Sequence, residues 1–309
     1  MSVSIQTAYN GEVLENLLVR ATTNNELVSG GHIHLQPDVS KKFSIPRLRA
    51  GSMLQKRIED PQKEDSQGNF TIDEVYLEPK DVMAYTVFNP RSFEQFWRKW
   101  QPTGNLLFHE LPTDAQNAML AELAKVVDFE LGTAFLTGVY GPSAGQFFDG
   151  ILTKIVANPD VVSLAGADAI TEANVISVLG SVKGNISKSL RGNPNLKIFM
   201  SVEDADIYDS ALTNRQFKGT DYTDRNPERF KGIQIVPLAA MPKDAVFAAV
   251  GSSGLDSNLW AGVSLADDCE TVQIDKLSNP SELYFFKMLM KIDTNIVWGE
   301  DVVLYDGRA

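Results

Sequence analysis

The sequence predicts an α+β fold in which one long helix packs on a sheet, and three patterns carry this prediction. Apolar residues recur at steps of three and four from Met119 to Phe135, which favours a helix over residues 113–136 with one apolar face. Every even position from Tyr284 to Trp298 is apolar except Thr294, which is typical of a strand with one buried face. Helix-like and strand-like segments alternate between residues 151 and 255, which favours a compact α/β unit.

The composition describes a chain that can bury a core and that carries an excess of acid. Hydrophobic residues make up 43% of the 309 residues, the mean hydropathy is −0.13 and the net charge is −12. Such a chain is repelled by nucleic acid unless basic residues gather locally. No apolar run approaches the about 20 residues of a membrane span, and the first residues lack the pattern of a signal peptide. The single cysteine, Cys269, excludes an internal disulfide and is typical of a reducing compartment.

Residues 1–40 are predicted to form an N-terminal arm. A weak amphipathic patch from Val13 to Leu18 is followed by polar residues and a glycine pair. Because the apolar content is so low, we expect the arm to become ordered only against a neighbouring molecule. His32 and His34 share one face of any strand that contains them. No further ligand stands near them in the sequence, so no metal site is expected.

Residues 43–88 are predicted to form a long two-stranded excursion. The strand-like run FSIPRL comes first, a polar segment follows, and the alternating runs FTIDEVYL and VMAYTVF close the region. Gly68 and Asn69 mark a turn. A hairpin with little apolar content at its tip is marginally stable by itself, so we expect this one to lie on a partner surface.

Two blocks of opposite charge lie within this region. The window from Lys41 to Arg57 contains basic residues and no acidic one, whereas acidic residues predominate from Glu59 to Asp81. The blocks are either two solvated faces or complementary patches that meet between neighbouring copies. Under the second interpretation, reversing the charge of both Arg47 and Arg49 blocks assembly and leaves the monomer folded. The candidates for contact between subunits are Lys41, Lys42, Arg47, Arg49, Lys56, Arg57, Glu59, Asp60, Glu64 and Asp65.

Three shorter helices are predicted in the middle of the chain. Asn89 caps the first, whose aromatic residues from Phe93 to Trp100 are expected in the core. The second begins at Thr171, and its apolar residues follow steps of three and four as far as Leu190. The third follows a capping box formed by Ser201 and Asp204.

The remaining segments are predicted as strands and loops. The polar stretch from Thr213 to Lys231 is expected to be a long exposed loop. Residues 232–237 and 245–250 are predicted strands. We expect Gly299 and Glu300 to turn the chain, so that residues 301–305 return as the partner of the long strand. That strand is expected to supply the apolar surface on which the 113–136 helix lies.

The usual catalytic and ligand-binding patterns are absent from the sequence. There is no GxxxxGK phosphate loop, and the glycines from Gly138 to Gly145 follow a helix instead of the strand that a dinucleotide site requires. Ser143 matches the letters GxSxG, but that motif also requires a strand before the serine. Three histidines and one cysteine provide no evident nucleophile–base set. We therefore expect no enzyme activity, no cofactor and no metal.

The order of these elements resembles the major capsid proteins of tailed double-stranded DNA phages, which share the Hong Kong 97 fold. The matching stretches are FDGIL at 148–152, KIFMS at 197–201, GIQIVP at 232–237 and the C-terminal YFFKMLMKIDTNIVWGEDVVLY. The resemblance covers almost the whole chain. It implies the Hong Kong 97-type division of an α+β chain: an N-terminal arm (1–42), an extended β-hairpin loop (43–88), a peripheral domain of long antiparallel strands (89–154 and 261–309) that includes the spine helix (113–136), and an axial α/β domain (155–260).

The resemblance implies a structural protein that assembles into an icosahedral shell around a phage genome. The implied partners are other copies of the chain in pentamers and hexamers, weakly held double-stranded DNA, and portal, scaffolding and decoration proteins, with no membrane. The implied location is the virion capsid, assembled in the cytoplasm of a bacterial host. Two alternatives stay open at this point: the shell of an encapsulin-like compartment, and a soluble α/β enzyme with an unrecognised site.

Overall fold

The computed structural model describes residues 26–39, 41–89, 113–143, 145–164, 168–214, 229–264, 272–277 and 283–308. Within these ranges, no helix is both long enough and apolar enough to cross a membrane. Three features expected from the sequence lie outside the described residues: the patch from Val13 to Leu18, the aromatic helix from Phe93 to Trp100, and Cys269. Most of the predicted loop from Thr213 to Lys231 lies outside them too.

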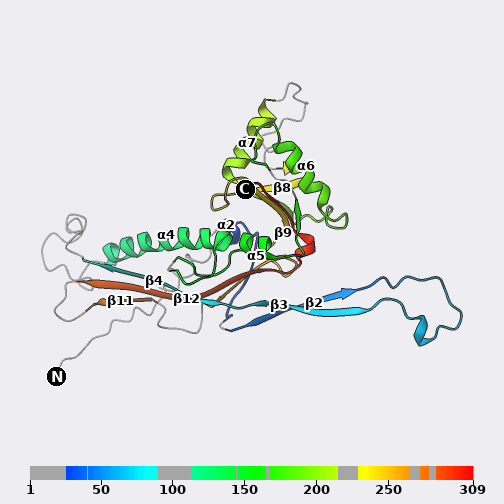
Figure 1. Cartoon of the computed structure of the whole chain (residues 1–309). Helices are drawn as coiled ribbons and strands as arrows, with labels where there is room; N and C mark the ends of the chain where they lie inside the picture. The colour runs from blue at the N-terminus through cyan, green and yellow to red at the C-terminus, as the bar shows by residue number, and fades with distance from the viewer. Residues whose placement is uncertain are drawn as a thin grey trace.

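Two sheets and one projecting hairpin organise the fold (Figure 1). The five-stranded sheet consists of β1 (His34–Gln36), β10 (Leu259–Ser264), β12 (Tyr284–Ile296), β11 (Val272–Lys276) and β4 (Lys80–Phe88). The six-stranded sheet has the order β5 (Val162–Leu164), β13 (Val303–Asp306), β9 (Ala245–Val250), β6 (Leu196–Ser201), β8 (Ile233–Leu238) and β7 (Arg229–Phe230). The hairpin is formed by β2 (Phe43–Ala50) and β3 (Phe70–Leu77).

The long helix predicted from apolar periodicity is confirmed as α4 (Thr113–Thr137). It lies along the five-stranded sheet (Figure 1), and its C-terminal half enters the main core with α5 (Ile151–Ala157). The Phe135 ring is fully buried and packs edge-on against the Phe148 ring, with the two ring centroids 5.7 Å apart. Val126, which the predicted stripe includes, is instead exposed. The apolar face of the helix is therefore narrower than the sequence pattern suggested.

The predicted long strand is confirmed as β12, and its even-numbered residues are all buried. Phe286, Met288 and Met290 belong to the same core cluster as α4, so the strand supplies the expected apolar surface. The predicted return of residues 301–305 along this strand is wrong, because β13 pairs with β5 and β9. Both edges of β12 are already occupied, by β10 and β11 on one side and by β4 on the other.

The six-stranded sheet carries α6 (Val175–Asn185) and α7 (Val202–Thr213), and the three share a second core. The second predicted helix starts at Val175 instead of Thr171, because the residues before it form a turn. The predicted cap at Ser201 is confirmed: its hydroxyl accepts a 3.0 Å hydrogen bond from the Asp204 amide. In a full capping box the Asp204 carboxylate would also accept a hydrogen bond from the Ser201 amide. Here it accepts a 3.0 Å hydrogen bond from the Asp244 amide instead. Burial raises the pKa of the Asp204 carboxyl.

Residues 26–39 pack on their own chain. The segment begins with α2 (Glu26–Ser29), and its residues Leu27 and Ile33 are buried in the main core. Further along the segment, β1 pairs parallel with β10. The expectation that residues 1–40 become ordered only against a neighbour is therefore wrong for this part. His32 also connects the segment to the six-stranded sheet, because its Nδ1 atom lies 2.7 Å from the Nζ atom of buried Lys197.

We predict that His32 makes the stability of the fold sensitive to mild acid. Burial and the Lys197 ammonium lower the pKa of His32 from 6.5 to about 4, so the unfolded chain binds the proton first. The stabilising effect of neutral His32 is therefore complete above pH 6.5 and is lost as the pH falls toward 4. After a discount for solvent screening, we expect a loss of about 1–2 kcal/mol by about pH 4.5.

Urea denaturation at about pH 7 and about pH 4.5 measures this loss in the wild type and in His32→Gln. The glutamine oxygen can accept a hydrogen bond from Lys197, as Nδ1 does, but it does not titrate. The variant should therefore lose less free energy of unfolding on acidification, while other titrating groups contribute equally to both proteins. Equal losses in the two proteins would show that His32 does not act in this way.

Candidate assembly surfaces

The β2–β3 hairpin has two unlike faces. Its strands pair antiparallel, with Leu48 opposite Ile72 and Arg47 opposite Asp73. Because directly opposed residues point to the same side, the even-numbered residues of both strands share one face, here called the outer face. The odd-numbered residues form the inner face. The predicted two-stranded pairing is confirmed, but residues 80–88, expected in the same excursion, form β4 in the five-stranded sheet.

The inner face packs against the body of its own chain near the base of the hairpin. Ile45 and Leu77 are buried there in a small core with Trp260 and Val297. This packing fixes one end of the hairpin, while the other end extends well beyond both sheets (Figure 1).

Two arginines extend this contact outward along the inner face. Arg47 forms a bidentate ion pair with Asp73 across the hairpin, and its Nη1 atom donates a 2.6 Å hydrogen bond to the carbonyl oxygen of Val297. The guanidinium groups of Arg47 and Arg49 both lie over the Trp298 ring, at 5.3 and 4.9 Å from its centroid. Charge, stacking and apolar burial thus hold the same face on the body.

The predicted charge blocks are partly paired within one chain. The ion pairs are Lys42 with Glu78, Arg47 with Asp73, Arg49 with Glu300, and Asp81 with Lys291. Reversing Arg47 and Arg49 would therefore disturb the docking of the hairpin on its own body, which changes the expected effect of that double variant. Among the described residues, the members of the candidate set without an ion pair are Lys41, Lys56, Arg57, Glu59, Asp60, Glu64 and Asp65.

We predict that Arg47→Met loosens the hairpin and lowers the free energy of unfolding by about 1–3 kcal/mol. The substitution keeps an apolar stem but leaves Asp73 and the Val297 carbonyl without this donor. Lys42→Met is the matched control, because it also removes a paired cation from the hairpin, yet both partners of its ion pair are half exposed. Urea denaturation should show a change within about 0.5 kcal/mol for the control. Equal effects of the two substitutions would contradict the proposed role of Arg47.

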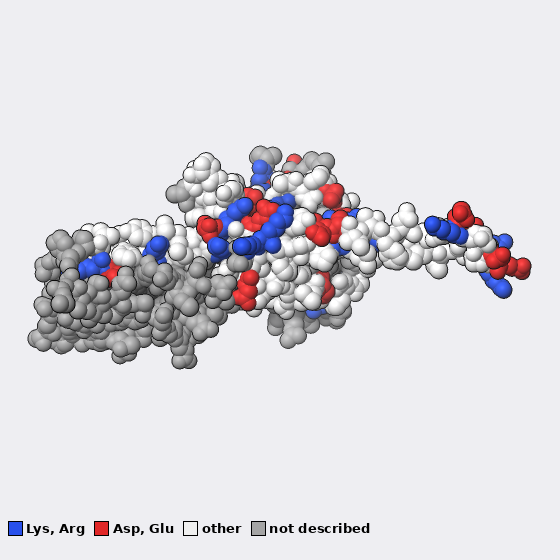
Figure 2. Space-filling model, turned by 90° about the horizontal axis from the view of Figure 1, so that it is seen from below, with Lys and Arg blue, Asp and Glu red and all other residues white. Residues whose placement is uncertain are grey.

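The outer face is apolar and open to solvent in its half toward the tip, whereas Ser44, Glu74 and Tyr76 make the half toward the base polar. Leu48, Phe70 and Ile72 are 61%, 67% and 71% exposed, and Pro46 and Ala50 lie on the same face. Beyond the strands, Leu54 is 94% exposed. Seen from below, the hairpin shaft is largely uncharged and charged side chains gather at its tip (Figure 2). A contiguous exposed apolar patch of this kind is typical of a protein–protein contact.

A second surface with exposed apolar side chains follows β4 on the side of the five-stranded sheet opposite α4, and is here called the lower sheet face. β4 contributes Met83, Tyr85 and Val87, which are all exposed. In the pairing of β4 with β12, Tyr85 is opposite Lys287 and Met83 is opposite Leu289. The surface thus combines apolar and aromatic side chains with lysines. α4 lies along the upper side of this sheet (Figure 1).

The direction of the hairpin is fixed where β3 passes into β4. The Glu78 amide donates a 2.7 Å hydrogen bond to the Asp293 carboxylate, and the Asn295 side chain donates a 2.8 Å bond to the Tyr76 carbonyl. Asp293 is buried within β12, and this burial raises the pKa of its carboxyl. Residues of the long strand therefore position the hairpin relative to the lower sheet face.

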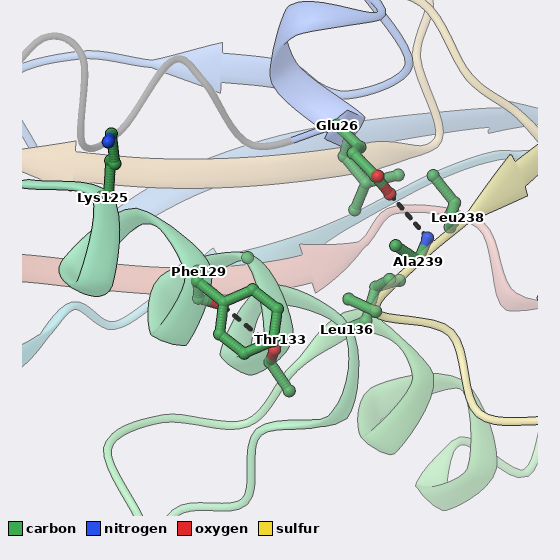
Figure 3. A pocket seen from close by; sticks show the side chains of 10 residues that line it. Glu26, Lys125, Phe129, Thr133, Leu136, Leu238 and Ala239 are labelled. Atoms are coloured by element: carbon green, nitrogen blue, oxygen red, sulfur yellow. Dashed lines mark hydrogen bonds between the residues drawn. The ribbon is translucent and has the colours of Figure 1, made fainter.

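A hollow of about 260 Å³ lies between α2, α4 and the residues that follow β8 (Figure 3). Its lining includes the Phe129 ring, which is 75% exposed, and Leu136. Glu26 of the lining accepts a 2.7 Å hydrogen bond from the Ala239 amide. Lys125 of the lining pairs with Glu122 at 2.8 Å. The described lining fits an apolar side chain, and among its residues no nucleophile has a base beside it.

The described residues include no group of three or more His, Cys, Asp or Glu that is placed to hold a metal ion. His34 hydrogen-bonds through Nδ1 to the Ser253 carbonyl at 2.8 Å, and His32 bonds Lys197. Both histidines therefore have structural contacts.

The open outer face is a feature that the sequence prediction missed. A signal for it was present in β3, where the apolar residues change sides. Phe70 and Ile72 occupy even positions, whereas Val75 and Leu77 occupy odd ones. A strand with apolar residues on opposite faces in its two halves needs two partner surfaces. One is the body of the same chain, and the exposure of Leu48, Phe70 and Ile72 shows that the described part of the chain does not supply the other.

We compared the chain with known protein families, sequences and structures. No protein-family model matches the chain, and no curated protein sequence is similar to it. Among solved structures, the chain is similar to one from the procapsid of satellite phage P4, with 14% identity, a TM-score of 0.65 and coverage of 99% of this chain and 94% of that one. It is also similar to the capsid of the native GTA particle, with 15% identity, a TM-score of 0.57 and coverage of 91% and 89%.

A further match is the SrpI encapsulin of Synechococcus elongatus, with 9% identity, a TM-score of 0.51 and coverage of 99% of this chain and 91% of that one. Together these similarities show that the chain has a mixed α+β fold of the phage capsid-protein type. They extend over nearly the whole length of each protein. The fold resemblance inferred from the order of elements is therefore confirmed.

Proposed function

We propose that this chain is a major capsid protein, whose copies assemble into an icosahedral shell around the genome of a tailed double-stranded DNA phage. The observation that carries the proposal is the hairpin. It packs on the body of its own chain at its base, yet it presents an open apolar face far from the main core. A solitary protein gains nothing from such a face, whereas a repeated assembly buries it on every subunit. The capsid-type fold supports the same conclusion.

In this proposal the elements take the roles that the resemblance implies. The hairpin is the extended loop and α4 is the spine helix. The five-stranded sheet with α4 and α5 forms the peripheral domain, and the six-stranded sheet with α6 and α7 forms the axial domain. Two proposed boundaries differ from those that the resemblance implies. The peripheral domain takes in β10 from its start at Leu259, because β10 pairs in the five-stranded sheet. The axial domain takes in β13 from its start at Val303, because β13 pairs in the six-stranded sheet.

Assembly proceeds by burial of the outer face of one copy on the lower sheet face of the next. Leu48, Phe70 and Ile72 supply the apolar area, and Met83 and Tyr85 of the neighbour receive it. The charged residues at the hairpin tip then lie on the neighbour, where their unpaired side chains find partners. These tip residues are Lys56, Arg57, Glu59, Asp60, Glu64 and Asp65.

The shell is a structural assembly without a catalytic role. Its further partners are portal, scaffolding and decoration proteins; the P4 procapsid includes a size determination protein. The net charge of −12 favours weak, non-specific contact with packaged DNA. The protein is located in the virion capsid, after assembly in the cytoplasm of a bacterial host.

Light scattering and electron microscopy of the purified protein test this function. The proposal predicts closed shells of uniform diameter above a threshold concentration. A compact monomer at every concentration would refute it and would favour a soluble enzyme.

The similarity to an encapsulin supports one alternative, a shell that encloses proteins. The contents of particles isolated from the native source separate the two. Nuclease-resistant double-stranded DNA is expected for the capsid, whereas a packaged enzyme without DNA would favour the encapsulin-like compartment.

A further inference from the structure

Cations gather at the part of the six-stranded sheet where β6 and β8 begin, here called the basic edge. One exposed carboxylate, Asp256, also lies there and accepts a 2.9 Å hydrogen bond from the Asn195 side chain. β6 and β8 run parallel, so the chain segments that lead into them lie at the same edge. No acidic residue occurs between residues 173 and 201 or between residues 229 and 242. The exposed or half-buried cations of these segments are Lys183, Lys188, Arg191, Arg229 and Lys231.

Hydrogen bonds hold the segments of this basic edge together. The Lys183 Nζ atom donates a 2.7 Å bond to the carbonyl oxygen of Lys231, which ties the end of α6 to the start of β8. Arg191 donates to the Gly184 carbonyl at 2.7 Å and to the Ile186 carbonyl at 3.1 Å. The backbone of the edge is therefore preorganised. Lys188 and Lys231 remain exposed, and no described carboxylate forms an ion pair with any of its cations.

The opposite edge of the same sheet, here called the acidic edge, carries more carboxylates than cations, although exposed Lys243 also lies there at the start of β9. β9 runs antiparallel to β6, and β13 antiparallel to β9, so the end of β6 lies beside the start of β9 and the end of β13. Three exposed carboxylates without an ion pair to a described residue belong here: Asp168, Glu203 and Asp206. Glu203 and Asp206 are one helical turn apart at the start of α7.

These two edges cannot pair within one molecule. The six residues of β6 separate them by about 20 Å, at about 3.3 Å per residue. This distance exceeds the Debye length of about 8 Å in physiological salt. A second copy in head-to-tail orientation brings the basic edge of one domain against the acidic edge of the next. Repeated by rotation, such a heterologous contact closes into a ring.

We propose that the basic edge of the six-stranded sheet binds the acidic edge of a neighbouring copy, and that this contact closes the rings from which the shell is built. The inference rests on the proposed shell function and names the partner of this surface. A second copy is favoured over nucleic acid because the same domain carries, on its opposite edge, carboxylates that form no ion pair with a described residue. The net charge of −12 also disfavours DNA as the partner.

Charge exchange between the two edges tests the proposal. Lys188→Glu with Lys231→Glu reverses the basic edge, and Glu203→Lys with Asp206→Lys reverses the acidic edge. Each double variant should lower the yield of shells at least tenfold at physiological salt, because like charges then meet. The quadruple variant should restore assembly, because its two edges are again complementary. Unchanged circular dichroism and thermal melting establish that each variant is folded.

Assembly of the wild type separates failure of the edge contact from failure of the proposed shell function. If the wild type and both double variants form shells equally well, the edge contact is refuted and the shell function stands. If the quadruple variant stays as defective as the double variants, the edge contact is likewise refuted. A loss of duplex DNA binding in Lys188→Glu with Lys231→Glu, with shells unchanged, would assign the basic edge to nucleic acid instead. If the wild type forms no shells, the proposed function and the edge contact are both overturned.

Discussion

Ile72→Glu is expected to abolish shell assembly and to leave the folded monomer intact. Ile72 is 71% exposed at the middle of the outer face, opposite Leu48. A carboxylate there costs the monomer little, because the position already faces water, so the free energy of unfolding should change by less than about 0.5 kcal/mol. In the assembled state the same carboxylate would be buried against the apolar side chains that receive Ile72, which costs several kcal/mol at each contact. Light scattering and electron microscopy measure the outcome.

Thr71→Glu is the matched control for this prediction. It places the same carboxylate one residue away on the inner face, opposite Arg49, at a position that is also exposed. This variant should assemble like the wild type. Normal shells from Ile72→Glu would contradict the proposed role of the outer face. If both variants failed to assemble, the effect would follow from added charge on the hairpin and not from the apolar face.

Phe135→Ala is expected to cost about 3–5 kcal/mol in the free energy of unfolding, the largest stability effect predicted for this protein. The ring is fully buried at the point where α4 meets the main core, edge-on to Phe148. Its removal leaves a cavity between the helix and the sheet, because a helix held along its length cannot collapse into the space. Urea denaturation with linear extrapolation gives the value.

Phe129→Ala provides the comparison within the same helix. The Phe129 ring is 75% exposed beside the hollow of Figure 3, so its loss should change the free energy of unfolding of the monomer by less than about 0.5 kcal/mol. A small effect of Phe135→Ala, or equal effects of the two substitutions, would mean that α4 does not pack on the sheet as described.

The elements that could be predicted from the sequence are those whose burial follows one local period. α4 and β12 each have one buried face along their length, so the recurrence of apolar residues reports their type and approximate bounds. The exposure of Val126 marks the limit of this reasoning. The pattern reports which residues are apolar, whereas burial also depends on how wide the opposing surface is.

The destination of β13 could not be predicted in the same way. Its sequence is compatible with a return along β12, and the turn before it fits that path. The outcome depended on which strand edges were free, and β12 had none. Val303, Leu304 and Tyr305 are buried in succession, which suits a strand with both faces covered.

The charged residues of the candidate site illustrate a similar limit. The sequence identified blocks of opposite sign but could not identify partners, because Arg49 pairs with Glu300, 251 residues away. Arg47 and Lys42 pair within the chain too, so the docking of the hairpin uses charges that the sequence had assigned to neighbouring copies. The apolar outer face, which now carries the argument for assembly, was visible in the sequence as a change of side between Ile45 and Leu48 in β2 and between Ile72 and Val75 in β3.

The most direct test of the central claim is an electron microscopy reconstruction of the assembled particle at side-chain resolution. Our account predicts that Leu48, Phe70 and Ile72 of each hairpin are buried against the lower sheet face of an adjacent subunit. A particle in which these side chains remain open to solvent, or in which each hairpin folds back on its own chain, would contradict it.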